Sequence, residues 1–263
     1  MTQIATAADS MLPRPQNAST FQPHTEDVFF HVAEHRLAAT RVYAPDGAAP
    51  ALIHLHGLGP TATRHGVRYL LDDLAAHGHS SVTFEFSGNG ESTGVLEEAT
   101  LRRRRDESLA AARLLDGETR PVVMGTSMGA HLAAWTVPVL DPRALVLFCP
   151  AAYPGHAADL PFDGSLARPG RYADSPAYAA MREFTGDLLI VGARDDQVVP
   201  ATVLDGYLDS AEKARTRRLI WLDGDHFVHR RLPGQGAPRR DLLALLRTFV
   251  ADSNRKSQQE GHS

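Results

Sequence analysis

Cysteine is almost absent from this sequence, which has one such residue, Cys149, among 263. An internal disulfide is therefore impossible, and a metal cluster held by several thiolates lacks its ligands. Cys149 ends the apolar run Ala144–Cys149. We therefore expect a buried and unreactive thiol.

An excess of basic residues is also missing, because 27 lysines and arginines stand against 31 acidic residues and the net charge is −4. The chain has no sequence-wide positive field for polyanions, so we expect no nucleic-acid partner. Residues 1–22 lack both the basic start and the unbroken apolar stretch of a signal peptide or a membrane anchor. We therefore expect no membrane partner and a cytoplasmic location.

The composition is otherwise that of a globular protein, with 43% hydrophobic and 22% charged residues, which excludes a disordered or fibrous chain. A single α/β domain often reaches this length. Both ends are polar and poor in apolar residues, so we expect flexible tails over 1–24 and 253–263 and one domain over 25–252. Residues 151–186 are rich in proline, glycine and aromatics and are expected to form an irregular insertion.

Short apolar runs alternate with helix-like stretches along the domain. Eight runs predict strands: Val28–Ala33, Leu37–Tyr43, Ala51–His56, Ser81–Phe86, Pro121–Gly125, Ala144–Cys149, Leu188–Val191 and Leu219–Leu222. Five stretches with apolar residues three and four apart predict helices: Val67–Ala76, Leu101–Leu115, Met128–Leu140, Ala201–Ala214 and Arg239–Val250. This alternation predicts an α/β fold with a mostly parallel sheet of about eight strands, helices on both faces, and an antiparallel hairpin at its start.

The segment Pro121–Ala130 joins a predicted strand to a predicted helix through the pattern G-x-S-x-G, centred on Ser127. A sharp turn at this place holds the serine in an unfavourable backbone conformation, and glycines two residues away on each side leave room for it. The hydroxyl of Ser127 would then project into a pocket, next to the free N–H groups at the start of the helix. Position and electrostatics therefore both favour a nucleophile.

A serine nucleophile needs a base that removes its proton, and the base needs an acid that orients it. Candidates for both follow along the chain. One predicted strand leads to Asp195 and Asp196, and a later strand leads to His226. Because the carboxyl ends of parallel strands share one edge of the sheet, we expect these side chains to meet Ser127 there, where open α/β sheets bind ligands.

The serine motif, the aspartates and the histidine follow one another along the chain in the order Ser, Asp, His. With these motifs in this order, residues 26–252 resemble the α/β-hydrolase family. Two further segments carry the resemblance: His56–Gly59 after the third strand and the Gly-rich turn at 84–92, as in small esterases and thioesterases. The resemblance implies an α/β-hydrolase fold with a short lid at about 151–186. It also implies that Ser127 is the nucleophile, that His226 is the general base and acid, and that the N–H groups of Met128 and Leu58 form the oxyanion hole.

The family pattern leaves two candidates for the acid of the triad. Counting four residues back from Pro200 selects Asp196, whereas counting three residues on from Gly192 selects Asp195. We favour Asp196, because the spacing to the proline is the commoner pattern.

Aromatic residues of the insertion could line an apolar acyl or aromatic site, or they could anchor the insertion to the core. The residues proposed to bind substrate are His56, Tyr153, Phe162, Tyr172 and Phe184. His56 is also expected to shape the oxyanion hole. Arg168 and Arg171 are candidates for contact with an anionic substrate.

The sequence thus predicts a serine hydrolase that cleaves a small-molecule ester or thioester through an acyl-serine intermediate, without a cofactor. The alternatives are an acyltransferase, lyase or cyclase on the same triad and, less favoured, a non-catalytic ligand receptor. No metal is expected, because the pairs His54/His56 and His77/His79 lack a third ligand at a metal-binding spacing. The run Arg102–Arg105 is expected to form a solvated helix face, and no oligomeric state is predicted.

Overall fold

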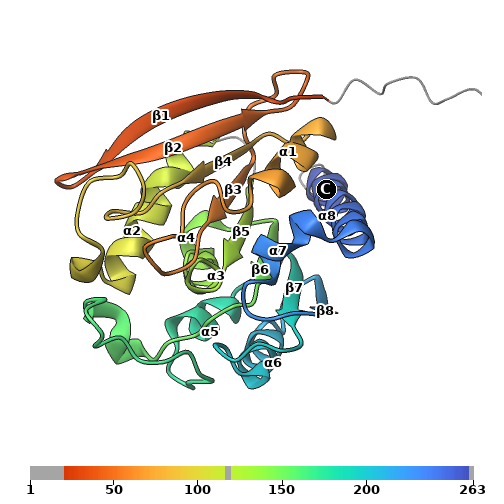
Figure 1. The fold of residues 1–263 in the computed structure, drawn as a ribbon. Coiled ribbons are helices and arrows are strands. Elements are labelled where there is room, and N and C mark those ends of the chain that lie inside the picture. The colour runs from red at the N-terminus through yellow and green to blue at the C-terminus, as the bar shows by residue number, and fades with distance from the viewer. Residues whose placement is uncertain (1–20, 116–119, 261–263) are drawn as a thin grey trace, which may run out of the picture.

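The structure, a computed structural model, describes residues 21–115 and 120–260, and these form a single eight-stranded sheet covered by helices (Figure 1). The strands lie in the order β1-β2-β4-β3-β5-β6-β7-β8. Their bounds are β1 His24–Val32, β2 His35–Tyr43, β3 Leu52–Leu55, β4 Ser81–Phe84, β5 Val122–Thr126, β6 Ala144–Phe148, β7 Asp187–Ala193 and β8 Thr216–Leu222. All eight predicted strands are present, with ends shifted by a few residues.

The sheet is antiparallel only at one edge. β1 and β2 form a hairpin in which Val32 pairs with His35, and β2 also runs antiparallel to β4. The remaining neighbours are all parallel. The prediction of a mostly parallel sheet that begins with a hairpin is therefore confirmed.

The helices connect the strands on both faces of the sheet. The α-helices are α1 Arg68–Ala76, α2 Leu101–Ala111, α3 Met128–Trp135, α4 Val137–Leu140, α5 Pro176–Met181, α6 Ala201–Ser210, α7 Val228–Arg231 and α8 Gly236–Glu260. Short 3₁₀ turns are η1 Leu96–Glu98, η2 Ala112–Leu114, η3 Gly155–Asp159 and η4 Leu232–Gly234. The five predicted helices are present. The short helices α5 and α7 were not predicted, because four to six residues are too few to show a helical period.

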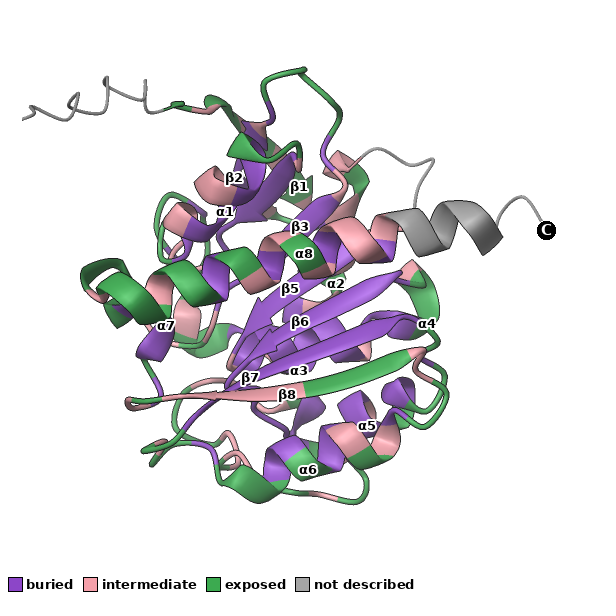
Figure 2. Ribbon diagram, turned by 90° about the vertical axis from the view of Figure 1, so that its right-hand side faces the viewer, coloured by how far each residue is buried: buried purple, intermediate pink, exposed green. Residues whose placement is uncertain are grey.

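Helices cover both faces of the sheet, whose central strands are buried (Figure 2). Buried apolar side chains form one hydrophobic layer on each face. Along β5, Val122 and Met124 pack in the layer under α1 and α8, whereas Val123 packs on the opposite side with α2, α3, α5 and α6. This alternation follows from the two-residue period of a strand. Because both faces of the central strands are covered, those strands are apolar throughout.

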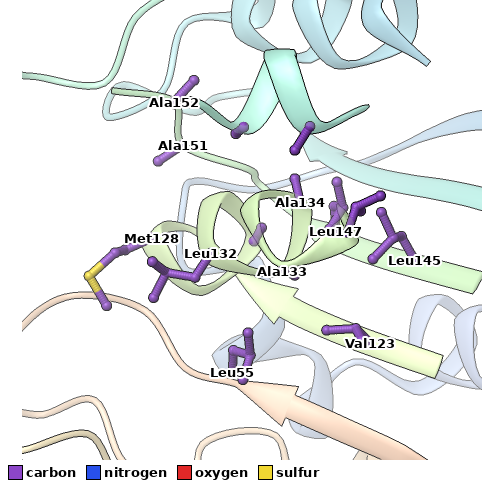
Figure 3. Packing of buried hydrophobic residues seen from close by; sticks show 14 of the residues in the cluster. Leu55, Val123, Met128, Leu132, Ala133, Ala134, Leu145, Leu147, Ala151 and Ala152 are labelled. Carbon is purple, nitrogen blue, oxygen red and sulfur yellow. The ribbon is translucent and has the colours of Figure 1, made fainter. Parts of the chain in front are cut away.

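Helix α3 packs flat against the sheet through small and apolar residues (Figure 3). Ala133 and Ala134 are fully buried on it, and Leu132 belongs to the same cluster as Leu55 and Val123 of the strands below. Alanine side chains let the helix backbone lie close to the strands. This close approach sets the position of the turn that precedes α3.

The ends of the domain differ in part from the predicted boundaries. Helix α8 continues to Glu260, so residues 253–260 extend a helix instead of forming the expected tail, and Ser253 is buried. Polar residues can prolong a helix whose earlier turns are fixed by packing. At the other end, β1 starts at His24, and the tail expected before it lies almost wholly in 1–20, outside the described residues. No helix in the described ranges is long and apolar enough to cross a membrane.

The solvated face expected for Arg102–Arg105 is wrong for Arg104, which is fully buried. Its Nη2 donates to Asn89 Oδ1 at 3.3 Å, its Nη1 lies 3.6 Å from Glu107 Oε2, and its guanidinium covers the ring of Phe86 at 4.8 Å. Burial lowers the pKa of Arg104 to about 10, and the charge of Glu107 opposes this shift. Consecutive helical residues point in different directions, so one arginine of the run faces the interior.

His131 of α3 is fully buried, and neither ring nitrogen has a hydrogen-bond partner among the described residues. Its ring packs edge-on against Tyr153 at 5.1 Å and against Trp135 at 5.9 Å. Burial lowers the pKa of His131 to about 3. The folded protein therefore holds this imidazole neutral, whereas an unfolded chain protonates it below about pH 6.5.

We expect His131→Leu to flatten the pH dependence of stability. In the wild type, the contribution of His131 is complete above about pH 6.5 and is lost as the pH falls towards 3, by up to about 1.4 kcal/mol per pH unit. Urea unfolding between pH 8 and pH 5 measures this slope. The exposed His65→Gln is the control and should keep the wild-type slope; an unchanged slope in His131→Leu would contradict the assignment.

Candidate active site

Ser127 lies in the turn between β5 and α3 with a positive φ of 53°. Residues other than glycine rarely adopt this backbone conformation, so neighbouring hydrogen bonds must hold the backbone of Ser127 in place. The N–H of Ser127 donates to Phe148 O at 2.8 Å, and its carbonyl accepts from Ala151 N at 3.2 Å. The turn is therefore anchored to the end of β6, and the strained serine stands at the carboxyl edge of the sheet.

Glycines flank Ser127 because the chain around it is too crowded for side chains. A Cβ atom on Gly125 would lie 2.4 Å from Gly129 O, and one on Gly129 would lie 2.1 Å from Leu55 O. Neither clash can be relieved by rotating a side chain, since both involve the backbone. The two glycines of the G-x-S-x-G motif are thus required by the close contact of α3 with β5 at Gly125 and with β3 at Gly129.

His226 lies just after β8 and links Ser127 to Asp196. Its Nε2 lies 2.9 Å from Ser127 Oγ, and its Nδ1 lies 2.8 Å from Asp196 Oδ2. An ionised carboxylate only accepts hydrogen bonds, so Nδ1 carries the proton and Nε2 is free to accept from the serine hydroxyl. The His226 side chain is almost fully buried, which shields this arrangement from water.

Asp196 is held by hydrogen bonds to both of its carboxylate oxygens. Besides His226, it accepts from the backbone N–H groups of Val198 and Val199, each at 2.8 Å. Burial alone would raise the pKa of Asp196, but these hydrogen bonds outweigh it and leave the pKa below the usual value of an aspartate. The neighbouring Asp195 is exposed, and its N–H donates to Gly224 O at 3.0 Å. The structure therefore brings Asp196, and not Asp195, to His226.

Cys149 lies beneath Asp196, fully buried, with a positive φ of 42°. Burial, and then the charge of Asp196, raise the pKa of its thiol to about 12. The thiol is therefore buried and protonated, which agrees with the expectation of a buried and unreactive cysteine. In the described part of the chain, the one group of three possible metal ligands is Cys149, Asp196 and His226, two of which already share the hydrogen bond described above.

The loop after β3 passes directly beside the nucleophile. A Cβ on Gly57 would lie 3.3 Å from Thr126 O and 3.4 Å from Ser127 Cβ. Leu58 follows in this loop, and Met128 is the first residue of α3. For neither backbone N–H is a protein hydrogen-bond partner found among the described residues. In the described ranges neither N–H is therefore engaged by the protein, as the predicted oxyanion hole requires.

His56 fixes this loop from below and does not line the main cavity. Its Nδ1 lies 2.7 Å from Gly57 O, and its Nε2 accepts from Phe86 N at 3.2 Å. Burial, together with the positive charge of Arg104, lowers the pKa of His56 to about 3. A neutral His56 therefore bridges the two loops, which is a positioning role in place of the expected contact with substrate.

A cavity of about 380 Å³ opens beside Ser127 and His226. Tyr153 and Phe162, two of the residues proposed to bind substrate, line it together with Leu166, Ala167 and Pro169 of the insertion. A second part of the lining consists of Val198 and three residues that follow His226, namely Phe227, His229 and Arg230. Sequence reasoning missed that part because it did not predict α7, although its residues come directly after the predicted base.

Two predicted substrate-binding residues lie elsewhere. Phe184 is buried in the core. Tyr172 lines a separate surface depression with Arg171, and its hydroxyl donates to Arg168 O at 2.9 Å. The aromatic residues are therefore divided between two places: those in the first half of the insertion face the cavity, whereas the second half, with α5, anchors the insertion to the core.

We expect Gly129→Ala to destabilise the protein by more than about 3 kcal/mol, because the new methyl group meets backbone atoms of β3. Thermal or urea unfolding measures the loss, and failure to accumulate folded protein counts as the same result. Gly234→Ala is the control, because nothing lies within 4 Å of its added Cβ. Equal stability of the two variants would contradict the crowded turn.

A family model described as "Alpha/beta hydrolase family" matches residues 52–247 of the chain. None of the curated proteins matches the sequence. The matched segment runs from β3 into α8 and includes Ser127, Asp196 and His226.

Solved structures of hydrolases share the arrangement of the chain. An esterase of Pyrococcus furiosus is 17% identical, with a TM-score of 0.66 over 93% of this chain and 99% of that one. Est1E from Butyrivibrio proteoclasticus, solved with ferulic acid, is 17% identical, with a TM-score of 0.65 over 87% and 99%. The thioesterase domain from the curacin biosynthetic pathway is 15% identical, with a TM-score of 0.63 over 84% and 99%. At these identities the likeness shows the fold.

Proposed function

Because this chain belongs to the alpha/beta hydrolase family, we propose that it is a serine hydrolase that cleaves a carboxylic ester or thioester through an acyl-serine intermediate. The observation that carries the proposal is the unbroken hydrogen-bond chain from Asp196 through His226 to Ser127, with distances of 2.8 and 2.9 Å. Such a chain activates a hydroxyl that is otherwise a weak nucleophile. The esterase and thioesterase folds among the similar structures support the same reaction class.

In the first half-reaction, Ser127 Oγ attacks the acyl carbonyl carbon while His226 Nε2 takes its proton. The carboxylate of Asp196 stabilises the imidazolium that forms, and its lowered pKa keeps it ionised. The tetrahedral intermediate then expels the alcohol or thiol, which receives the proton from His226. The products of this step are the acyl ester of Ser127 and the free leaving group.

In the second half-reaction, a water molecule takes the place of the leaving group. His226 removes a proton from this water, which attacks the acyl carbon and releases the acid from Ser127. In both steps the negative charge develops on the former carbonyl oxygen. We assign the N–H groups of Met128 and Leu58 to this oxygen, since they flank Ser127 and have no protein partner in the described ranges.

The cavity suits a small to medium acyl or aromatic group. Its volume of about 380 Å³ lies towards the lower end of the range for small-molecule sites. Phe162, Leu166 and Tyr153 make its interior largely apolar. A small-molecule ester or thioester is therefore the proposed substrate.

The cytoplasmic location and the lack of a nucleic-acid partner stay predictions.

Ser127→Ala should lower the hydrolysis of p-nitrophenyl butyrate and of butyryl thioesters by about 10³-fold or more, because the nucleophile is lost. Product analysis decides between hydrolysis and transfer, since a transferase would pass the acyl group to an acceptor without releasing acid. A fluorophosphonate should label wild-type Ser127 and leave Ser127→Ala unlabelled, as read by mass spectrometry. Equal labelling of both proteins, or full activity of the variant, would overturn the proposal.

The adjacent aspartates offer a matched pair of variants. Asp196→Asn should lower kcat by about 10³-fold to 10⁴-fold, because an amide can present its NH₂ to His226 and favour the wrong tautomer. Asp195→Asn should stay within about twofold of the wild type, since its exposed side chain has no contact with His226. Steady-state kinetics with p-nitrophenyl butyrate measure both. The reverse order of effects would assign the acid to Asp195.

A further inference from the structure

The residues that line the catalytic cavity include two arginines and no acidic residue among those described. Arg168 comes from the insertion and Arg230 from α7, so the two cations reach the cavity from separate segments of the chain. Both residues are exposed, which places their charges at the mouth and leaves the interior to Tyr153, Phe162 and Leu166. The cavity therefore has an apolar interior and a positively charged entrance.

Arg230 is oriented at this entrance by two contacts. Its Nη1 donates to Thr61 Oγ1 at 3.3 Å, and its guanidinium lies 5.4 Å from the centre of the Phe227 ring. Neither contact neutralises its charge. The nearby His229 adds no charge of its own at neutral pH, because burial and then Arg230 lower its pKa to about 4.

Neighbouring arginines in the same segments are paired with acids, whereas the two at the entrance are not. Arg171, three residues after Arg168, forms an ion pair with Asp209 at 2.5 Å. Arg231, next to Arg230, forms one with Asp225 at 2.5 Å. Within the described ranges, no acidic side chain lies within ion-pair distance of the guanidinium of Arg168 or Arg230. Their charges thus remain available to a ligand.

Three apolar side chains complete the entrance. Leu58, Val198 and Phe227 all line the cavity and are each about 40% exposed or more. Large apolar side chains gathered around a cavity mark a surface that is covered by a ligand. A ligand that covers this rim and also meets the two guanidinium groups must have both an apolar part and a negative charge.

We propose that the substrate carries an anionic group, a carboxylate or a phosphate, away from the bond that is cleaved, and that Arg168 and Arg230 bind this group. The inference rests on the proposed function, because it concerns the substrate of the same Ser127 site. It goes further by naming the two residues that select the substrate. The sequence also suggested Arg171 as a contact for an anionic substrate. We do not assign this role to Arg171, because its charge is paired with Asp209.

Matched esters that differ only in charge test the proposal. One pair places the charge on the acyl side: p-nitrophenyl hydrogen adipate against p-nitrophenyl methyl adipate. A second pair places it on the leaving group: 4-(butanoyloxy)benzoate against its methyl ester, with 4-(butanoyloxy)phenyl phosphate as the phosphate form. We expect kcat/KM to favour an anionic member of at least one pair by about tenfold, and to lose this preference as the salt concentration rises from about 20 mM to about 500 mM.

Arg168→Gln and Arg230→Gln should each reduce the ratio of anionic to neutral kcat/KM by about threefold to tenfold, mainly through KM. Arg171→Gln and Arg231→Gln are the matched controls and should keep the wild-type ratio, because their charges are already paired. No preference in either pair, or an equal change in the control variants, would overturn the assignment.

A binding measurement separates this inference from the proposed function. Calorimetry with the Ser127→Ala variant compares the affinities of the same anionic and neutral esters without turnover. Tighter binding of the anionic ester that is lost in Ser127→Ala/Arg230→Gln supports the assignment even where no ester is cleaved. If the wild type hydrolyses the neutral esters but Ser127→Ala binds anionic and neutral esters equally, the proposed function stands and the proposed selection of an anionic substrate is wrong.

Discussion

The close packing of α3 against both β5 and β3 is the constraint on which the rest of the site depends. It leaves no room for side chains at Gly125 and Gly129, and it bends the chain so sharply that Ser127 takes a positive φ. A conformation of this kind persists only where the surrounding structure holds it. Here the small residues of α3, the hydrogen bond to the end of β6 and the loop at Gly57 together provide that support.

The parallel part of the sheet then brings the other side chains to the same edge. β5, β7 and β8 end on one side, so the loops that follow them deliver Ser127, Asp196 and His226 from distant parts of the chain. β6 lies between β5 and β7 and places Cys149 under the carboxylate of Asp196. At this edge the carboxylate of Asp196 is ionised, whereas His56 beneath the loop stays neutral.

Patterns that reflect local geometry could be predicted from the sequence, and contacts between distant segments could not. The short apolar runs predicted the strands of the sheet, and the glycines around Ser127 predicted the sharp turn. Both predictions were possible because the strand pattern and the crowding of the backbone directly determine which residue types can occur at these positions. The buried Arg104 and the division of the insertion aromatics, with Phe184 in the core and Phe162 at the cavity, depend on which neighbours pack against each residue. Helix α7 is too short to show a period, so the part of the cavity lining with Arg230 was missed.

The way the insertion is attached determines how its sequence can vary. Tyr207 donates to Ala151 O at 2.6 Å at one end, and at the other end α5 is packed against α3 and α6, with Tyr178 donating to Val203 O at 3.0 Å. Both ends thus belong to the scaffold, and apart from Tyr153 the insertion residues that line the cavity all lie between residues 160 and 170. Substitutions at the cavity-lining positions of that stretch would therefore reshape the ligand space, while the hydrogen bonds of Phe162 N to Ala99 O and of Gly170 N to Ala152 O keep its backbone attached to the domain.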